Sequence, residues 1–110
     1  MSVTDMNKID AIGKSKTNDE LDLLITDHLD WENEYEHLVI LQDKINIYLG
    51  YIESKQFFVT HPNESVDGYV IEIVFKNGIT ERCFKFLETI GNQLKQYKIR
   101  IRIEVYDPDD

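Results

Sequence analysis

The spacing of the apolar residues changes along the chain, and this change constrains the fold more than any other feature. Leu21, Leu23 and Ile25 occupy every second position, which is typical of a strand with one buried face. After Trp31 the apolar residues recur at spacings of three and four, which predicts a helix over 33–54. Its apolar stripe consists of Leu38, Leu41, Ile45, Tyr48 and Ile52. A strand period followed by a helix period indicates a mixed α and β protein.

The other segments extend this pattern. Short alternating stretches predict strands over 9–14 and 20–27, and further strands are expected over 69–75 and 99–105. Residues 56–68 are expected to form a loop, in which the segment 57–59 could dock on the core. Thr80 suits the N-cap of a second helix that runs to about Tyr97. The expected buried positions of that helix are Cys83, Leu87, Ile90, Leu94 and Tyr97.

The element order is therefore ββαβαβ. Every strand is apolar on one side only, so both helices must shield the same face of the sheet. The sequence predicts an α+β fold, a two-layer α/β sandwich of a four-stranded sheet with two helices on one face. It leaves the order of the strands open. With 110 residues the chain is expected to be a single domain over 1–110, with flexible tails at 1–7 and 107–110.

The net charge of -9 limits the classes of partner. Residues 1–55 contain 12 acidic and 5 basic residues, whereas residues 56–110 contain 9 and 7, so most of the excess lies in the first half. This charge argues against binding to nucleic acid or to an anionic membrane, because both need exposed Lys and Arg. A basic protein is the complementary partner. No run of about 18 apolar residues occurs, and a cytoplasmic location is expected.

The acidity is densest in the segment 27–37, where the predicted strand gives way to the long helix. Between Lys16 and Lys44 there are nine carboxylates and two histidines but no Lys or Arg. The candidate binding residues in this segment are Asp27, His28, Asp30, Trp31, Glu32, Glu34, Glu36 and His37. Much of the segment also has a structural explanation. Asn33 with Glu36 resembles a capping box, and aspartates commonly accept hydrogen bonds from backbone amides at such junctions.

The segment also contains ligand types that bind metal ions. Asp27, His28, Asp30 and His37 could hold a divalent cation, but their spacing matches no known metal motif. The only cysteine, Cys83, is expected to be a small buried side chain, and no nucleophile motif is present. We therefore predict no cofactor and a protein without enzymatic activity, with a metal-dependent enzyme or regulator as the alternative.

The first half of the chain resembles a small bacterial domain family of unknown function. The most specific part of this resemblance is the segment Thr26-Asp27-His28-Leu29-Asp30-Trp31 together with His37. Further parts are Ile9-Asp10-Ala11-Ile12-Gly13, Leu24-Ile25, Leu41-Gln42-Asp43-Lys44-Ile45-Asn46 and Ile52-Glu53-Ser54. The second half resembles the family only in its order of elements. The resemblance supports the expected fold and implies no activity or ligand.

Taken together, these features predict an acidic module that binds a basic protein. One form of this hypothesis is an immunity-type protein that inhibits a basic toxin by charge complementarity. The long helix has more apolar side chains than one sheet face can cover, because Val39, Ile40, Ile47, Leu49 and Tyr51 lie outside its main stripe. A homodimer formed through the helix around 38–52 is therefore also expected.

Overall fold

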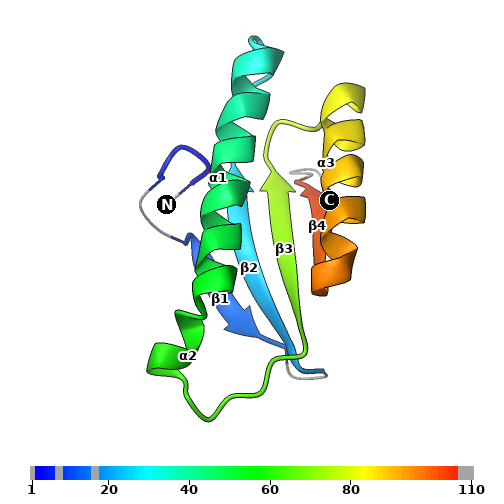
Figure 1. Ribbon diagram of the computed structural model, residues 1–110. Helices are drawn as coiled ribbons and strands as arrows, with labels where there is room; N and C mark the ends of the chain where they lie inside the picture. Colours follow the sequence, from blue (N-terminus) through cyan, green and yellow to red (C-terminus); the bar gives the residue numbers. More distant parts are fainter. Residues whose placement is uncertain (1, 7–8, 16–17, 107–110) are drawn as a thin grey trace.

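The computed structural model describes residues 2–6, 9–15 and 18–106, and it has a mixed four-stranded sheet covered by helices (Figure 1). The strands are β1 (Ala11–Lys14), β2 (Glu20–Asp27), β3 (Gly68–Phe75) and β4 (Ile99–Val105). The helices are α1 (Glu34–Ser54), the short α2 (Phe57–Thr60) and α3 (Glu81–Leu94), which continues into the 3-10 helix η1 (Lys95–Tyr97). In the sheet the strands lie in the order β1-β2-β3-β4.

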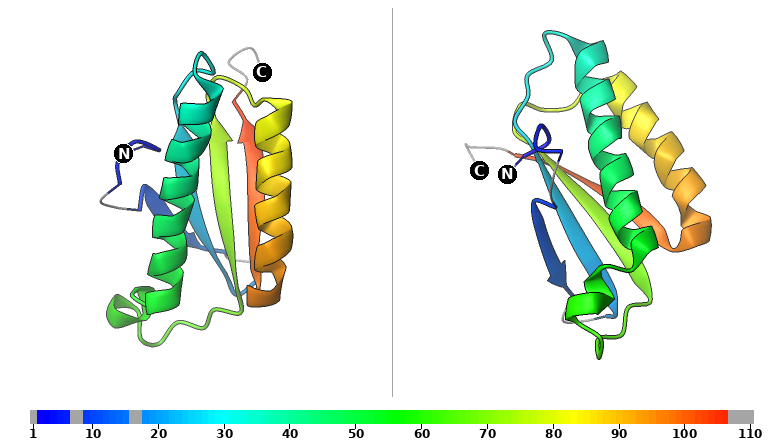
Figure 2. Two further views of the ribbon diagram at one scale, coloured as in Figure 1. Left: turned by 45° about the horizontal axis from the view of Figure 1, so that its top comes forward. Right: turned by 60° about the vertical axis from the view of Figure 1, so that its left-hand side comes forward.

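The direction of the strands follows from their connections. β1 and β2 are joined by a short segment and pair antiparallel, whereas β2, β3 and β4 are mutually parallel. Parallel neighbours need a long crossover, and α1 and α3 supply the two crossovers. Both helices lie on the same face of the sheet (Figures 1 and 2). The predicted ββαβαβ order and the two-layer α+β fold are therefore confirmed.

The core lies between the sheet and the two long helices. Neighbouring strands place apolar side chains side by side on the helix face, as in the row formed by Leu23, Ile71 and Ile101. The opposite, open face has charged residues, including Asp22 on β2 and the paired residues Glu72 on β3 and Arg102 on β4. This division explains the alternation of apolar and polar residues in β4, whereas β3 departs from the expected pattern because Val70 and Val74 lie on the open face with Glu72. Among the described residues, no helix combines the length and the apolar character that crossing a membrane requires.

The helix starts agree with the sequence-based expectations. The Asn33 side chain accepts a hydrogen bond from the Glu36 backbone N–H at 3.1 Å, and its own amide donates to Glu36 Oε2 at 3.2 Å. The Thr80 hydroxyl accepts a hydrogen bond from the Cys83 backbone N–H, also at 3.1 Å. Both caps satisfy amides that the first turn of a helix leaves without a partner.

The helix predicted to run from Thr80 to about Tyr97 corresponds to α3 and is shorter than predicted. Its α-helical part ends at Leu94, and the last turn is a 3-10 helix, after which Lys98 adopts a left-handed conformation with φ 61°. After this turn β4 begins at Ile99, and the Tyr97 side chain is 62% exposed. The prediction that Tyr97 belongs to the buried stripe is therefore wrong, because the α-helical period on which it rests has already ended.

Two other expectations need correction. β1 begins at Ala11 rather than at residue 9, because the Asp10 side chain accepts a hydrogen bond from the Thr26 N–H and contacts the long helix. The expected loop 56–68 contains the short helix α2, in which Phe57 is buried while Val59 is 78% exposed. Phe57 therefore anchors this segment to the core.

Part of the expected N-terminal tail packs on the sheet. Val3 is fully buried, and its backbone N–H donates to the Thr26 carbonyl at 2.9 Å. This contact lies beyond the short strand β1, so residues 2–6 cover the end of β2 that β1 does not reach. Residues 1, 7 and 107–110 of the expected tails lie outside the described residues.

Candidate functional site

The acidic junction between β2 and α1 contains a buried pair of side chains. Asp27 is the last residue of β2 and is fully buried, and His37 lies in the first turns of α1 with 3% exposure. His37 Nε2 lies 2.6 Å from Asp27 Oδ2. The pair therefore ties the carboxyl end of a central strand to the beginning of the long helix.

The second ring nitrogen of His37 is also engaged. Nδ1 lies 2.9 Å from the carbonyl oxygen of Asp30, so each nitrogen faces an oxygen acceptor. Because neither nitrogen is left over, His37 holds the strand-to-helix loop and has no free position for a substrate proton.

Trp31 covers the histidine ring from one side. The two rings stack with centroids 3.7 Å apart and an angle of 20°, and the centroid of the Phe75 ring lies 6.3 Å from that of the indole. The indole Nε1–H donates to the Gly78 carbonyl at 2.9 Å, as expected for a partly buried indole with a polar partner. Trp31 therefore links the loop after β2 to the loop after β3.

The aspartates of the loop accept hydrogen bonds from the backbone, as the sequence predicts. Asp27 Oδ1 accepts the Leu29 N–H, and Asp30 Oδ1 accepts the Glu32 N–H, both at 3.1 Å. From the neighbouring loop the Asn77 amide donates to the carbonyl oxygens of His28 and Leu29, at 2.8 and 3.2 Å. The loop is thus fixed by side chains from two elements, and its outer surface is preorganised.

The predicted site residues divide into an inner and an outer set. Asp27, His37 and Trp31 form the inner set described above. The outer set consists of the exposed side chains of His28, Asp30, Glu32 and Glu36, while Glu34 is partly buried and contacts Arg82 at 3.4 Å. A surface pocket of about 320 Å³ is lined by residues of both sets together with Leu29, Asn33 and Ile40. It lies at the carboxyl end of β2, the edge where sheets with parallel strands commonly bind ligands.

The four candidate metal ligands do not gather at one point. Within the described part of the chain, no group of three or more His, Cys, Asp or Glu side chains is arranged to hold a metal ion. Asp27 and His37 contact each other, whereas His28 and Asp30 are exposed at the surface. The exposed carboxylate of Asp30 thus lies at the surface of the loop, apart from the buried pair.

A second buried pair was not anticipated from the sequence. Asp10 Oδ1 lies 2.9 Å from Lys44 Nζ, and both side chains are almost fully buried. Lys44 also donates to the Asp5 carbonyl. The hydroxyl of Tyr48, one turn further along α1, accepts the Asp10 N–H at 2.8 Å and donates to the Leu24 carbonyl. Burial raises the pKa of this tyrosine above its usual range. The signal was present, because Lys44 interrupts the apolar stripe of the helix three residues after Leu41.

Cys83 is fully buried in α3, as predicted. Burial raises the pKa of its thiol to about 12, and the nearby Asp27 carboxylate acts in the same direction. A thiol in such surroundings stays protonated at neutral pH and is a poor nucleophile.

Comparison with known proteins places the chain in a family without an assigned activity. The model of a family described as "Family of unknown function (DUF6572)" matches residues 1–107. No curated protein and no solved structure matches the chain. The match covers nearly the whole chain, so the chain belongs to this family, and the resemblance to a family of unknown function is confirmed.

Proposed function

We propose that this member of a family of unknown function is a non-enzymatic binding module that holds a basic group of a partner protein at the junction of β2 and α1. The observation that carries the proposal is the division of the site into inner and outer sets. The groups suited to catalysis, His37 and Asp27, are buried and hydrogen-bonded to each other, whereas the exposed carboxylates of Asp30 and Glu36 line a pocket.

The chemistry of this surface supports a cationic ligand. Asp30, Glu32 and Glu36 are exposed on a loop and first helical turn that the inner residues keep in place. A guanidinium or ammonium group can form charge-assisted hydrogen bonds with such carboxylates. Because hydrogen bonds already hold the carboxylates of Asp30 and Glu36, ordering of these two side chains would cost the complex little affinity.

The proposal can be tested by charge reversal with a matched control. The site variant Glu32→Lys/Glu36→Lys and the control variant Asp43→Lys/Glu53→Lys change the net charge equally, and all four positions are exposed. Each immobilised protein would be used to capture partners from its native cell extract, and a captured protein would be purified and titrated by calorimetry. We expect the wild type and the control to bind the same basic protein, and the site variant to bind it at least about tenfold more weakly.

Two results would overturn the proposal. One is a partner that binds the site variant as tightly as the wild type, and the other is the capture of no basic protein by the wild type. Thermal unfolding of each variant would be compared first, because Glu36 also belongs to the helix cap. The affinity of the wild type should fall as salt concentration rises, since exposed charge contacts are screened.

A further inference from the structure

β4 has an outer edge that no other strand of the described chain occupies. The Tyr69 N–H donates to the Lys98 carbonyl at 2.9 Å, and the Tyr106 N–H donates to the Phe75 carbonyl at 2.8 Å. Successive residues of a strand direct their backbone groups to opposite edges, so the even-numbered residues of β4 face β3. Ile99, Ile101, Ile103 and Val105 therefore present their N–H and C=O groups at the outer edge, where another strand can pair with them.

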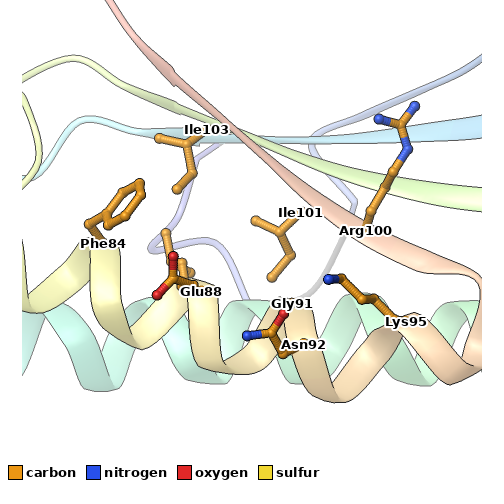
Figure 3. A pocket seen from close by; sticks show the side chains of 9 residues that line it. Phe84, Glu88, Gly91, Asn92, Lys95, Arg100, Ile101 and Ile103 are labelled. Atoms are coloured by element: carbon orange, nitrogen blue, oxygen red, sulfur yellow. The ribbon is translucent and has the colours of Figure 1, made fainter.

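Apolar side chains are exposed beside this edge. Phe84 is 49% exposed, Val105 50% and Tyr106 56%. A groove of about 250 Å³ runs between α3 and β4, with Phe84, Ile101 and Ile103 in its lining (Figure 3). A strand added at the edge would place alternate side chains on this same side of the sheet. Apolar side chains of such a strand would therefore fill the groove.

The open face of β4 has charges of both signs. Arg102 Nη1 lies 3.5 Å from Glu72 Oε2 on the neighbouring strand. The pKa of Glu72 is raised by partial burial and, after that, by the adjacent carboxylate of Glu104. Two carboxylates thus lie together with one guanidinium, and a second guanidinium would relieve their repulsion.

We propose that β4 pairs antiparallel with β4 of a second copy of the chain, about a two-fold axis at Ile103. The two sheets then form one continuous sheet of eight strands. Ile101 lies opposite Val105 of the second copy, and the two Ile103 residues face each other beside the grooves. On the open face Arg102 of each copy lies opposite Glu104 of the other, which supplies the second guanidinium.

The charges select this register from the alternatives. An axis at residue 102 places Arg102 opposite itself, and an axis at residue 104 places Glu104 opposite itself. An axis at residue 101 places Arg100 opposite Arg102 of the second copy. Like charges directly opposite each other destabilise a strand pair. An axis between two residues would place a residue whose N–H and C=O face the outer edge opposite one whose N–H and C=O face β3, so the two could not form hydrogen bonds. Among the described residues, the axis at Ile103 is therefore the one that combines backbone pairing with opposite charges.

This interface is separate from the acidic junction and from the helix surface that the sequence suggested for a dimer. On α1, Ile40, Ile47, Leu49 and Tyr51 are partly buried and pack against the core, and Val39 is only 38% exposed. Most of the apolar side chains outside the main stripe of α1 are thus in contact with the core of the same molecule. The proposal stands or falls independently of the binding function proposed above.

Sedimentation equilibrium of wild-type protein and charge variants tests the interface and its register. We expect the wild type to dimerise, and Arg102→Glu and Glu104→Arg each to weaken dimerisation at least about tenfold, because each variant opposes like charges. The double variant R102E/E104R should restore dimerisation to within about threefold of the wild type, since the opposite pairs are rebuilt with reversed sign. With the axis at residue 102, the same double variant would oppose like charges at both charged pairs, 102 with 102 and 100 with 104.

A cysteine at the axis gives an independent measurement that does not depend on the charges. Facing residues of a hydrogen-bonded antiparallel pair have Cα atoms about 5.5 Å apart, which suits a disulfide. Ile103→Cys should therefore cross-link to a dimer on mild oxidation, whereas the wild type should not, because Cys83 is fully buried. Val39→Glu serves as the control for the α1 surface and should leave dimerisation unchanged.

A wild type that stays monomeric at 0.5 mM would overturn the proposal. So would a dimer that Val39→Glu dissociates while Arg102→Glu and Glu104→Arg do not, because that result assigns the interface to α1. If the double variant dimerised as weakly as the single variants, the register with its axis at Ile103 would be wrong. Circular dichroism of each variant would establish that it is folded before its association is measured.

Discussion

At the scale of single residues, the site depends on one histidine whose two nitrogens are both committed. His37 connects Asp27 at the end of β2 with the Asp30 carbonyl in the following loop, and Trp31 covers its ring. These contacts of His37 stabilise the fold of the junction. The acidic residues that surround it in the sequence are at the surface, where they can contact a partner.

Replacement of this histidine should strongly destabilise the protein. We expect His37→Ala to lower the free energy of unfolding by about 3–5 kcal/mol, because it leaves the buried Asp27 carboxylate without its partner. Urea unfolding at pH 7 measures the change. His28→Ala is the matched control, since His28 is exposed, and it should change stability by less than about 0.5 kcal/mol. A loss below about 1 kcal/mol for His37→Ala would show that the pair does not hold the junction.

The thiol of Cys83 should be almost inert in the folded protein. It is fully buried, and its pKa is raised to about 12, so it reacts only after the structure opens. Reaction with an aromatic disulfide reagent at pH 8 should be at least about a hundredfold slower in buffer than in 8 M urea. If the two rates were within about tenfold of each other, the packing around α3 would have to be much looser than the structure indicates.

At the scale of elements, local patterns predicted the strands and helices well because each depends on residues close in the sequence. The caps Asn33 and Thr80 and the stripe around Leu41 were recognisable for this reason. The pairing of Lys44 with Asp10 was not, because 34 positions separate the two residues and only the tertiary fold brings them together. Strand order was also left open, since it depends on how α1 and α3 cross the sheet.

The end of α1 offers a simple stabilising change. Lys55 follows the helix with φ 58° and ψ 29°, a left-handed conformation that glycine adopts without steric cost. We expect Lys55→Gly to raise the free energy of unfolding by about 0.5–1 kcal/mol, as measured by urea unfolding. Glu53→Gly, inside the helix, should lower it by about 1 kcal/mol. If both variants were destabilising, the left-handed turn would not be under strain.

At the scale of the whole molecule, the acidic charge is distributed over two different surfaces. The junction of β2 and α1 presents carboxylates without a basic side chain between them in the sequence. The open face of the sheet pairs its carboxylates with arginines of β4, as Glu20 does with Arg100 at 2.7 and 3.0 Å. A basic partner at the first surface and a second copy at the edge of β4 would therefore not compete for the same residues.

The open face should give the stability of the molecule two opposing pH dependences. The hydrogen bond from Arg100 lowers the pKa of Glu20, so Glu20 contributes stability above its ordinary pKa of 4.5 and this contribution is lost as the pH falls. Burial and Glu104 raise the pKa of Glu72. The native state therefore holds the Glu72 proton more tightly than the unfolded state, and stability falls as the pH rises above 4.5.

Neutral substitutions separate the two effects. At pH 7 we expect Glu20→Gln to lower the melting temperature and Glu72→Gln to raise it, each by a few degrees at most, because exposed ion pairs contribute about 1 kcal/mol or less. Differential scanning calorimetry from pH 7 to pH 3.5 measures both differences at a low protein concentration. Both differences should shrink as the pH falls, because protonation makes each wild-type carboxyl resemble the amide, and the Glu72 difference should shrink at a higher pH than the Glu20 difference. Shifts of the same sign at pH 7 would contradict the opposite effects inferred for the two carboxylates, of which Glu20 contacts Arg100 and Glu72 lies beside Glu104.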